Sequence, residues 1–201
     1  MSFGQGEVTL VRHGETEWSR TGRHTGRTDI PLSPRGRQEA EAVGTILRGR
    51  EFALVVTSPL MRAVDTSRLA GFAADAERLP DLVEWDYGAY EGLRTAEIRA
   101  TRPGWTLWRD GVVDGESIDE VAARADAVIS ALRSASGPAL VFGHGHALRV
   151  LAARWLGLAP AEGRLLALDP ATISILGYEH ETAAVRRWNE PASEVGESPS
   201  P

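Results

Sequence analysis

The chain has 201 residues, a formal net charge of −6 and a hydrophobic fraction of 42%, values that suit a globular protein with one domain and one buried core. The acidic balance argues against a general nucleic-acid binder, and the lack of cysteine excludes disulfides, thiolate catalysis and cysteine-ligated metals. All 22 basic residues are arginine, which also excludes Schiff-base chemistry on lysine.

Strand and helix patterns alternate along the chain. In chain order we expect a strand at 7–11, a helix at 33–50, a strand at 52–58, a helix at 59–72, a short strand near 76–80, a polar and aromatic middle section at 82–115, a helix at 117–133, a strand at 138–144, a helix at 146–157, and a closing hairpin at 172–178 and 184–188. The first helix begins at a Ser33 cap followed by Pro34, and the second also starts with a proline.

This alternation predicts an α/β fold of three layers, in which a mostly parallel sheet carries helices on both faces. We see no repeat and no linker, so residues 1–188 are expected to form a single domain. Residues 189–201 are poor in apolar side chains and rich in Pro, Ser and Glu, which predicts a disordered tail.

Charged and histidine side chains follow three of the predicted strands. One strand ends at Arg12 and His13, another at Thr57-Ser58 with Arg62 one turn later, and a third at His144. Each of these residues alone is typical of an ordinary turn or helix start. Because ligands of open parallel sheets bind at the carboxyl ends of the strands, the four side chains together predict an anion site, with arginine as the phosphate clamp.

A metal site is the alternative for clustered histidines and carboxylates. The sequence has no HExxH or DxD spacing, and the flanking arginines would repel a cation. We therefore expect no metal and no other cofactor.

Four segments in this order, LVRHGETEW, TSPLMRAVDTS, EWDYGAYEG and FGHGHALRV, resemble the signature segments of the histidine phosphatase superfamily, the phosphoglycerate mutase-like proteins. The resemblance covers about residues 8–188 and implies a phosphohistidine mechanism. It implies that His13 is the nucleophile, that Arg12, Arg62 and His144 bind the phosphoryl group, and that Glu84 donates a proton to the leaving oxygen.

Further substrate contacts are expected around these residues. The resemblance places Thr25 and Gly26 near the substrate, and it also implies a role for Ser19, where the close mutase relatives usually carry Asn. Backbone near Gly145 is expected to approach the anion closely. Tyr87 is expected to contact substrate hydroxyls.

Arg109 is a less certain substrate contact in the Trp-rich part of the middle section. It could bind a second phosphate or a carboxylate of the substrate. The alternative is a surface arginine that pairs with Asp110 or Glu116.

The family includes both mutases and phosphatases, so three functions stay open. Only about 60 residues separate Glu84 from His144, fewer than in the cofactor-dependent mutases, and the middle section resembles a phosphatase subgroup that includes acid phosphatases and sedoheptulose bisphosphatase. We therefore favour a phosphatase of small phosphorylated metabolites such as sugar phosphates or phosphoglycerate derivatives. The alternatives are a mutase or phosphotransferase, and a weakly active module that binds phosphorylated ligands.

The expected partner is a small phosphorylated substrate. No apolar run approaches the roughly 18 residues of a membrane span, and the N-terminus has no signal-peptide pattern, so we expect a cytoplasmic protein without a membrane or nucleic-acid partner. Terminal strand segments such as AVRRW (184–188) could form the edge of a homodimer.

Overall fold

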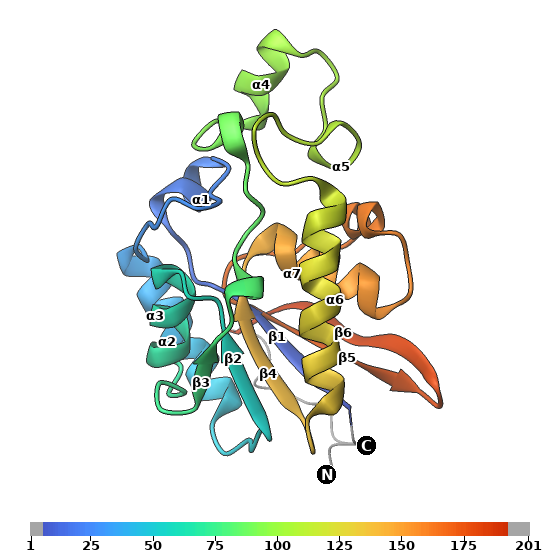
Figure 1. Ribbon diagram of the computed structural model, residues 1–201. Helices are drawn as coiled ribbons and strands as arrows, with labels where there is room; N and C mark the ends of the chain where they lie inside the picture. Colours follow the sequence, from blue (N-terminus) through green and yellow to red (C-terminus); the bar gives the residue numbers. More distant parts are fainter. Residues whose placement is uncertain (1–5, 193–201) are drawn as a thin grey trace.

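A six-stranded mixed sheet forms the centre of the protein, as seen in a computed structural model that describes residues 6–192 (Figure 1). The strands lie in the order β3-β2-β4-β1-β5-β6. The first four are mutually parallel, whereas β5 is antiparallel to both β1 and β6. The strands are β1 (Val8–Arg12), β2 (Leu54–Thr57), β3 (Ala76–Arg78), β4 (Ala139–Gly143), β5 (Thr172–Glu179) and β6 (Thr182–Pro191).

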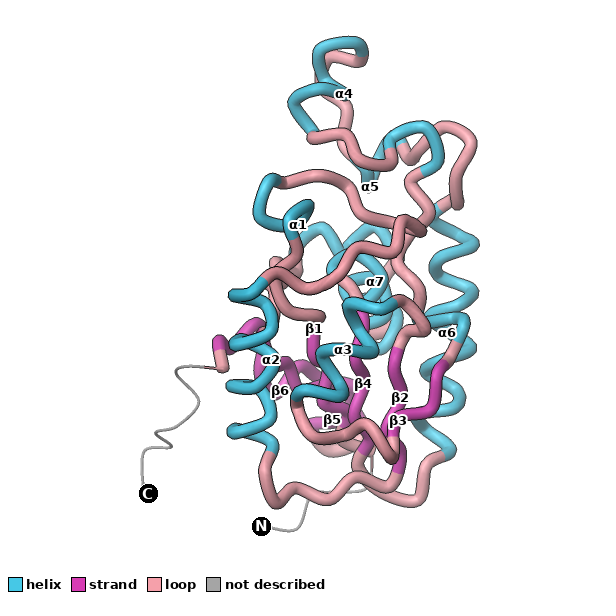
Figure 2. The backbone as a smooth tube through the Cα atoms, turned by 90° about the vertical axis from the view of Figure 1, so that its left-hand side faces the viewer, coloured by secondary structure: helices cyan, strands magenta, loops and turns pink. Residues whose placement is uncertain are grey.

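Helices cover both faces of this sheet. The helices of eight or more residues are α2 (Pro34–Leu47), α3 (Met61–Leu69), α6 (Ile118–Ser134) and α7 (Gly145–Trp155). The core on one face contains Val43 of α2 with Phe142 of β4, and the core on the other face joins α6 and α7 to Val141 of the same strand. Because successive strand residues point to opposite faces, β4 is apolar throughout. In Figure 2, α2 and α3 lie on the side of the sheet that faces the viewer. The predicted three-layer α/β fold is confirmed.

Local signals explain where the long helices begin. The Ser33 hydroxyl accepts a hydrogen bond from the Gly36 amide at 3.0 Å, and Pro34 occupies the first helical position. Ser117 and Glu120 form a capping box at the start of α6. Both arrangements satisfy amides that have no partner within the helix.

Short elements inside the loops were not expected from the sequence. They are α1 (Glu17–Thr21), α4 (Thr95–Thr101), α5 (Leu107–Asp110) and the 3₁₀ segments Pro80–Leu82, Gly88–Tyr90 and Pro160–Leu165. Segments of one or two turns carry too few apolar positions to show a helical period.

The closing strand is longer than predicted. β6 continues to Pro191, so residues 189–191, which we assigned to the disordered tail, belong to the sheet through their pairing with β5. Ala192 follows as a turn residue packed against the core that contains Val43 and Phe142, and the rest of that tail, 193–201, lies outside the described residues. The segment 184–188 lies in β6 at the edge of the sheet, and its role in a dimer stays a prediction.

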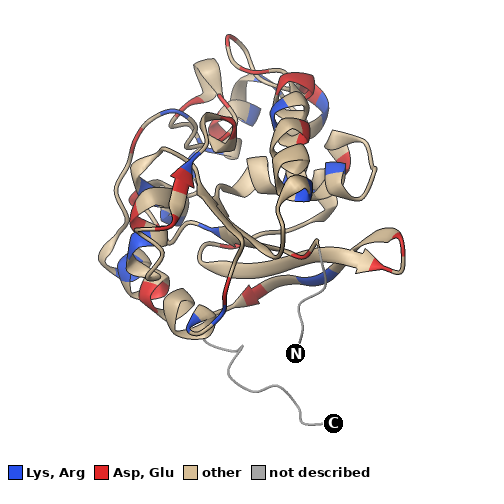
Figure 3. Cartoon of the chain, turned by 60° about the horizontal axis from the view of Figure 1, so that its bottom comes forward, with Lys and Arg blue, Asp and Glu red and all other residues tan. Residues whose placement is uncertain are grey.

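Charge is dispersed over the molecule. In the view of Figure 3, arginine and acidic segments alternate over helices and strands without a continuous basic face. Within residues 6–192, no helix is both long and apolar enough to cross a membrane. The carboxyl ends of β1, β2 and β4 share one edge of the sheet, and the middle section lies above that edge in Figure 1.

Candidate active site

Two histidines lie side by side where neighbouring parallel strands end. Arg12 of β1 is in register with Gly143 of β4, and the residues that follow them are His13 and His144. The His13 amide donates to the Gly143 carbonyl at 3.0 Å, and the two imidazole centroids are 5.2 Å apart. The register of β1 with β4 thus brings His13 and His144 together at the strand ends, as the sequence predicted.

The His13 ring is oriented by its own loop. Its Nδ1 lies 2.8 Å from the Gly14 carbonyl oxygen. A carbonyl can only accept, so Nδ1 carries the proton and the lone pair of the neutral ring is on Nε2. Burial, followed by the charges of Arg62 and Arg12, holds the pKa of His13 well below its ordinary value. The imidazole is therefore neutral and nucleophilic at Nε2.

Arg62 is fully buried at the start of α3 and bonded mainly to main-chain oxygens. Its guanidinium donates to the carbonyls of Thr25 (3.1 Å), Gly26 (2.9 Å) and Thr28 (3.0 Å). Glu91 secures this loop, since its carboxylate accepts from the Gly26 amide at 2.8 Å and the Thr28 amide at 3.1 Å. The loop therefore holds the arginine through its backbone.

Gly26 is required at its position because the chain passes very close to its neighbours. A Cβ built there would lie 2.5 Å from the Trp85 carbonyl oxygen and 2.6 Å from a carboxylate oxygen of Glu91. Any larger residue would push the loop away from the middle section. Thr25 and Gly26, predicted as substrate contacts, thus hold Arg62 through their carbonyls.

His144 has a defined tautomer as well. Arg62 donates its Nε proton to His144 Nδ1 at 3.1 Å, so the imidazole proton is on Nε2, which donates to the Ser58 hydroxyl at 2.7 Å. Burial and the Arg62 charge hold the pKa of His144 well below its ordinary value. Ser58, at the end of β2, thereby fixes the second imidazole.

Arg12, a half-buried residue, brings a second cation to the two histidines. One of its amino groups donates to the Leu168 carbonyl, whereas its buried Nε has no hydrogen-bond partner among the described residues. Buried donors are nearly always satisfied, so this one points to an anion. A Cβ at Gly145 would lie 3.3 Å from the Arg12 Cζ, which explains why the start of α7 is a glycine.

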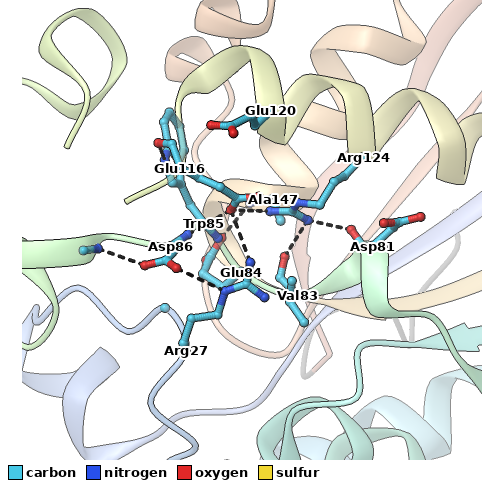
Figure 4. A network of polar contacts seen from close by, with 12 residues as sticks. Arg27, Asp81, Val83, Glu84, Trp85, Asp86, Glu116, Glu120, Arg124 and Ala147 are labelled. Atoms are coloured by element: carbon cyan, nitrogen blue, oxygen red, sulfur yellow. Dashed lines mark hydrogen bonds and ion pairs between the residues drawn. The ribbon is translucent and has the colours of Figure 1, made fainter. Parts of the chain in front are cut away.

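Glu84 lies at the N-terminus of α7, where its buried carboxylate accepts three backbone hydrogen bonds (Figure 4). Oε1 accepts from the amides of Trp85 (2.9 Å) and Ala147 (2.8 Å), and Oε2 accepts from the amide of His146 (3.0 Å). A helix N-terminus favours a negative charge. Burial lowers the pKa of both Arg12 and Arg62, and the negative charge of Glu84 opposes this effect, so the carboxylate is the acidic counterpart of the arginines.

Tyr87 is buried beside two histidines that sequence reasoning did not assign to the site. Its hydroxyl lies 2.7 Å from His146 Nδ1, and the His24 ring centroid is 4.8 Å from the tyrosine ring. The available signals were adjacency alone, because His24 precedes Thr25 and His146 is two residues beyond His144.

Two predicted residues are engaged elsewhere. The Ser19 hydroxyl donates to the Thr16 carbonyl at 3.0 Å and accepts from the Thr16 amide at 2.8 Å, as part of the cap of α1. Arg109 is exposed and pairs with Asp110 at 2.8 Å and 2.9 Å, which is the alternative that the sequence left open. Within the described residues, neither side chain hydrogen-bonds to the strand-end cluster of Arg12, His13, Arg62 and His144.

The arrangement suits a tetrahedral oxyanion. The guanidinium groups of buried Arg62 and half-buried Arg12 and two neutral imidazoles lie at one edge of the sheet, and a lone pair on His13 Nε2 is available for attack on phosphorus. Within residues 6–192, no group of three or more His, Asp or Glu side chains is placed to hold a metal ion.

Comparisons with known proteins agree with this chemistry. A sequence model of the Histidine phosphatase superfamily (branch 1) matches residues 8–191. An acid phosphatase of Mycobacterium tuberculosis is 44% identical over 177 residues, covering 86% of this chain and 87% of the relative. A sedoheptulose 1,7-bisphosphatase of Saccharomyces cerevisiae is 36% identical over 181 residues, covering 74% and 67%.

Comparison with solved structures also finds a similar fold. The solved structure of a Mycobacterium tuberculosis open reading frame product superposes with a TM-score of 0.88 at 40% identity, covering 94% of this chain and 100% of the solved chain. The family match extends from the start of β1 to the end of β6 and so includes every residue of the strand-end cluster. The chain belongs to the histidine phosphatase superfamily.

Proposed function

We propose that the protein is a phosphomonoester hydrolase of small phosphorylated metabolites that works through a phosphohistidine at His13. One observation carries the proposal: a neutral imidazole with its lone pair on Nε2 lies close to the charges of buried Arg62 and half-buried Arg12, and the buried Nε of Arg12 has no partner among the described residues. The sugar phosphates and phosphoglycerate derivatives are the favoured substrates, since the family and its phosphatase relatives support this class.

In the first step, the lone pair of His13 Nε2 attacks phosphorus and the bond from phosphorus to the leaving oxygen breaks. Arg12 and Arg62 stabilise the charge that spreads over the equatorial oxygens, and His144 joins them when its Nε2 proton leaves the Ser58 hydroxyl for a phosphoryl oxygen. Glu84 gives a proton to the leaving oxygen. For this transfer one carboxyl oxygen must exchange a backbone hydrogen bond for the leaving group.

In the second step, water attacks the phosphoryl group. Glu84 takes a proton from the water, the bond between Nε2 and phosphorus breaks, and inorganic phosphate leaves. Tyr87 and the backbone near Gly145 are the proposed contacts to the rest of the substrate. Arg109 has no part in this proposal because Asp110 holds it.

The test compares the native chain with His13→Ala and with His180→Asn as the matched control. His180 is an exposed histidine with a left-handed backbone that Asn tolerates. We expect acid-labile phosphohistidine on the native and control proteins during turnover of a phosphorylated-metabolite panel, and none on His13→Ala.

Other results would support a different function. Native turnover by His13→Ala would refute the proposal. Transfer to a second hydroxyl with a requirement for a bisphosphoglycerate would indicate a mutase, and binding without turnover would indicate a phospho-ligand-binding module.

A further inference from the structure

The segment that carries Glu84 has no regular secondary structure of its own. Residues 84–87 lie between two short 3₁₀ segments and outside the sheet. A side chain that must meet a leaving oxygen therefore depends on contacts from other elements for its position. The three backbone bonds to the carboxylate fix its far end, and two of them come from α7.

A bidentate ion pair holds this segment on both sides of Glu84 (Figure 4). Glu116, just before α6, accepts from Arg124 of α6 at 2.7 Å and 2.9 Å. Arg124 also donates to the carbonyls of Asp81 (2.6 Å) and Val83 (3.0 Å).

Glu116 completes the contact on the other side of Glu84. Its carboxylate accepts from the Asp86 amide at 3.0 Å, and its own amide donates to the Asp86 carbonyl at 3.0 Å. Its carbonyl accepts from the Trp85 indole at 2.8 Å. Backbone immediately before and after Glu84 is thus tied to one ion pair.

The Glu116–Arg124 ion pair is largely buried, so its two side chains are held in one arrangement. The side chains of Arg124 and Glu116 are 15% and 14% exposed. A buried ion pair adds little net stability compared with apolar packing, so its value here is the geometry of the backbone groups it binds. Arg27 approaches Asp86 and Glu116 only at 3.6 Å and 3.7 Å and is 46% exposed, which makes it a weak addition.

We propose that the Glu116–Arg124 pair is the positioning device for Glu84. The proposal rests on the proposed function, in which Glu84 is the proton donor to the leaving oxygen. Helix α6 then places the donor through the backbone, while α7 holds its carboxylate. Without Arg124, the Asp81 and Val83 carbonyls lose their partner and the segment moves away from the leaving oxygen.

The test is the dependence of kcat/KM on the leaving group, because kcat/KM reports the first step and not the attack of water that both substrates share. An alkyl phosphate such as glycerol phosphate needs a proton on its leaving oxygen, whereas p-nitrophenyl phosphate releases a stable phenolate without one. For Arg124→Met we expect kcat/KM for glycerol phosphate to fall about 30-fold or more and that for p-nitrophenyl phosphate to fall less than about 3-fold. Glu84→Gln should show the same selective loss, because it removes the donor itself.

Arg154→Met is the matched control. It removes a bidentate pair between Arg154 of α7 and Asp126 of α6, the two helices that hold Glu84, and should leave both kcat/KM values within about 2-fold. Glu116→Gln, which keeps the shape of the side chain, serves if Arg124→Met does not fold, and should give the same selectivity in weaker form. Arg124→Lys should restore part of the lost kcat/KM for glycerol phosphate.

The two proposals fail in different ways. If phosphohistidine is trapped on the native enzyme, an equal fall of kcat/KM for the two substrates in the folded Arg124 and Glu116 variants, or no fall for either, would overturn the positioning role. The absence of phosphohistidine on the native enzyme would instead refute the proposed function.

Discussion

The two buried histidines make a measurable contribution to stability. His13 is 4% exposed and His144 is 0% exposed, and burial together with the neighbouring arginines holds the pKa of each well below its ordinary value. In the unfolded chain each titrates near its usual pKa of about 6.5. Below that pH the unfolded chain binds more protons than the native protein, so the free energy of unfolding falls as pH falls. The contribution of the two histidines is fully present above that pH.

The size of the effect follows from the two protonation curves. Between about pH 7 and about pH 5.5, a histidine that stays neutral in the native protein and becomes charged on unfolding costs about 1 kcal/mol of unfolding free energy, and the pair costs about 2–3 kcal/mol. Total stabilities are about 5–15 kcal/mol, so urea titrations at the two pH values in phosphate-free buffer resolve this loss.

The comparison with His144→Gln isolates one histidine from all other titrating groups. The amide of this variant can still accept from Arg62 and donate to Ser58, but it does not titrate. We expect its loss of stability between the two pH values to be smaller than that of the native chain by about 1 kcal/mol. Identical pH dependence of the two proteins would refute the neutral, buried state of His144. His180→Asn, on the exposed turn, should behave as the native chain does.

Three further predictions concern the same strand-end cluster. Ser58→Ala leaves the His144 Nε2 proton buried without its acceptor, so the free energy of unfolding should fall by about 1–3 kcal/mol in urea titrations; an unchanged value would contradict the assigned tautomer. Gly145→Ala places a Cβ 3.3 Å from the Arg12 guanidinium and should raise the inhibition constant of vanadate several-fold, whereas unchanged inhibition would show that Arg12 does not contact the phosphoryl position. Treatment with a chelator should leave turnover intact, because arginines supply the charge at this site; lost turnover that returns with added metal would count against that account.

Much of the fold could be predicted because its long elements carry strong local signals. β4 is apolar on both faces, and the Ser33 and Ser117 caps mark two helix starts. The convergence of His13 and His144 also follows from sequence, since adjacent parallel strands end at one edge. The order of the strands did not follow, because register depends on pairing between distant segments.

The middle section shows what sequence patterns could not supply. Glu84 lies in backbone without a period, so only the family resemblance assigned it a role, and its partners on α6 and α7 come from distant parts of the chain. Arg109 could not be assigned because the adjacent Asp110 competes for the guanidinium. The end of β6 was missed because a polar edge strand and a disordered tail have similar composition.

Arg62 is held by backbone atoms of its loop, so the side chains of that loop are not needed to position it. Its guanidinium rests on carbonyl oxygens of residues 25, 26 and 28, and every amino acid has such an oxygen. Gly26 is restricted by space. The side chains at 25 and 28 can therefore be exchanged with little consequence for the arginine, so this loop could acquire contacts to new substrates during evolution while the phosphoryl site stays unchanged.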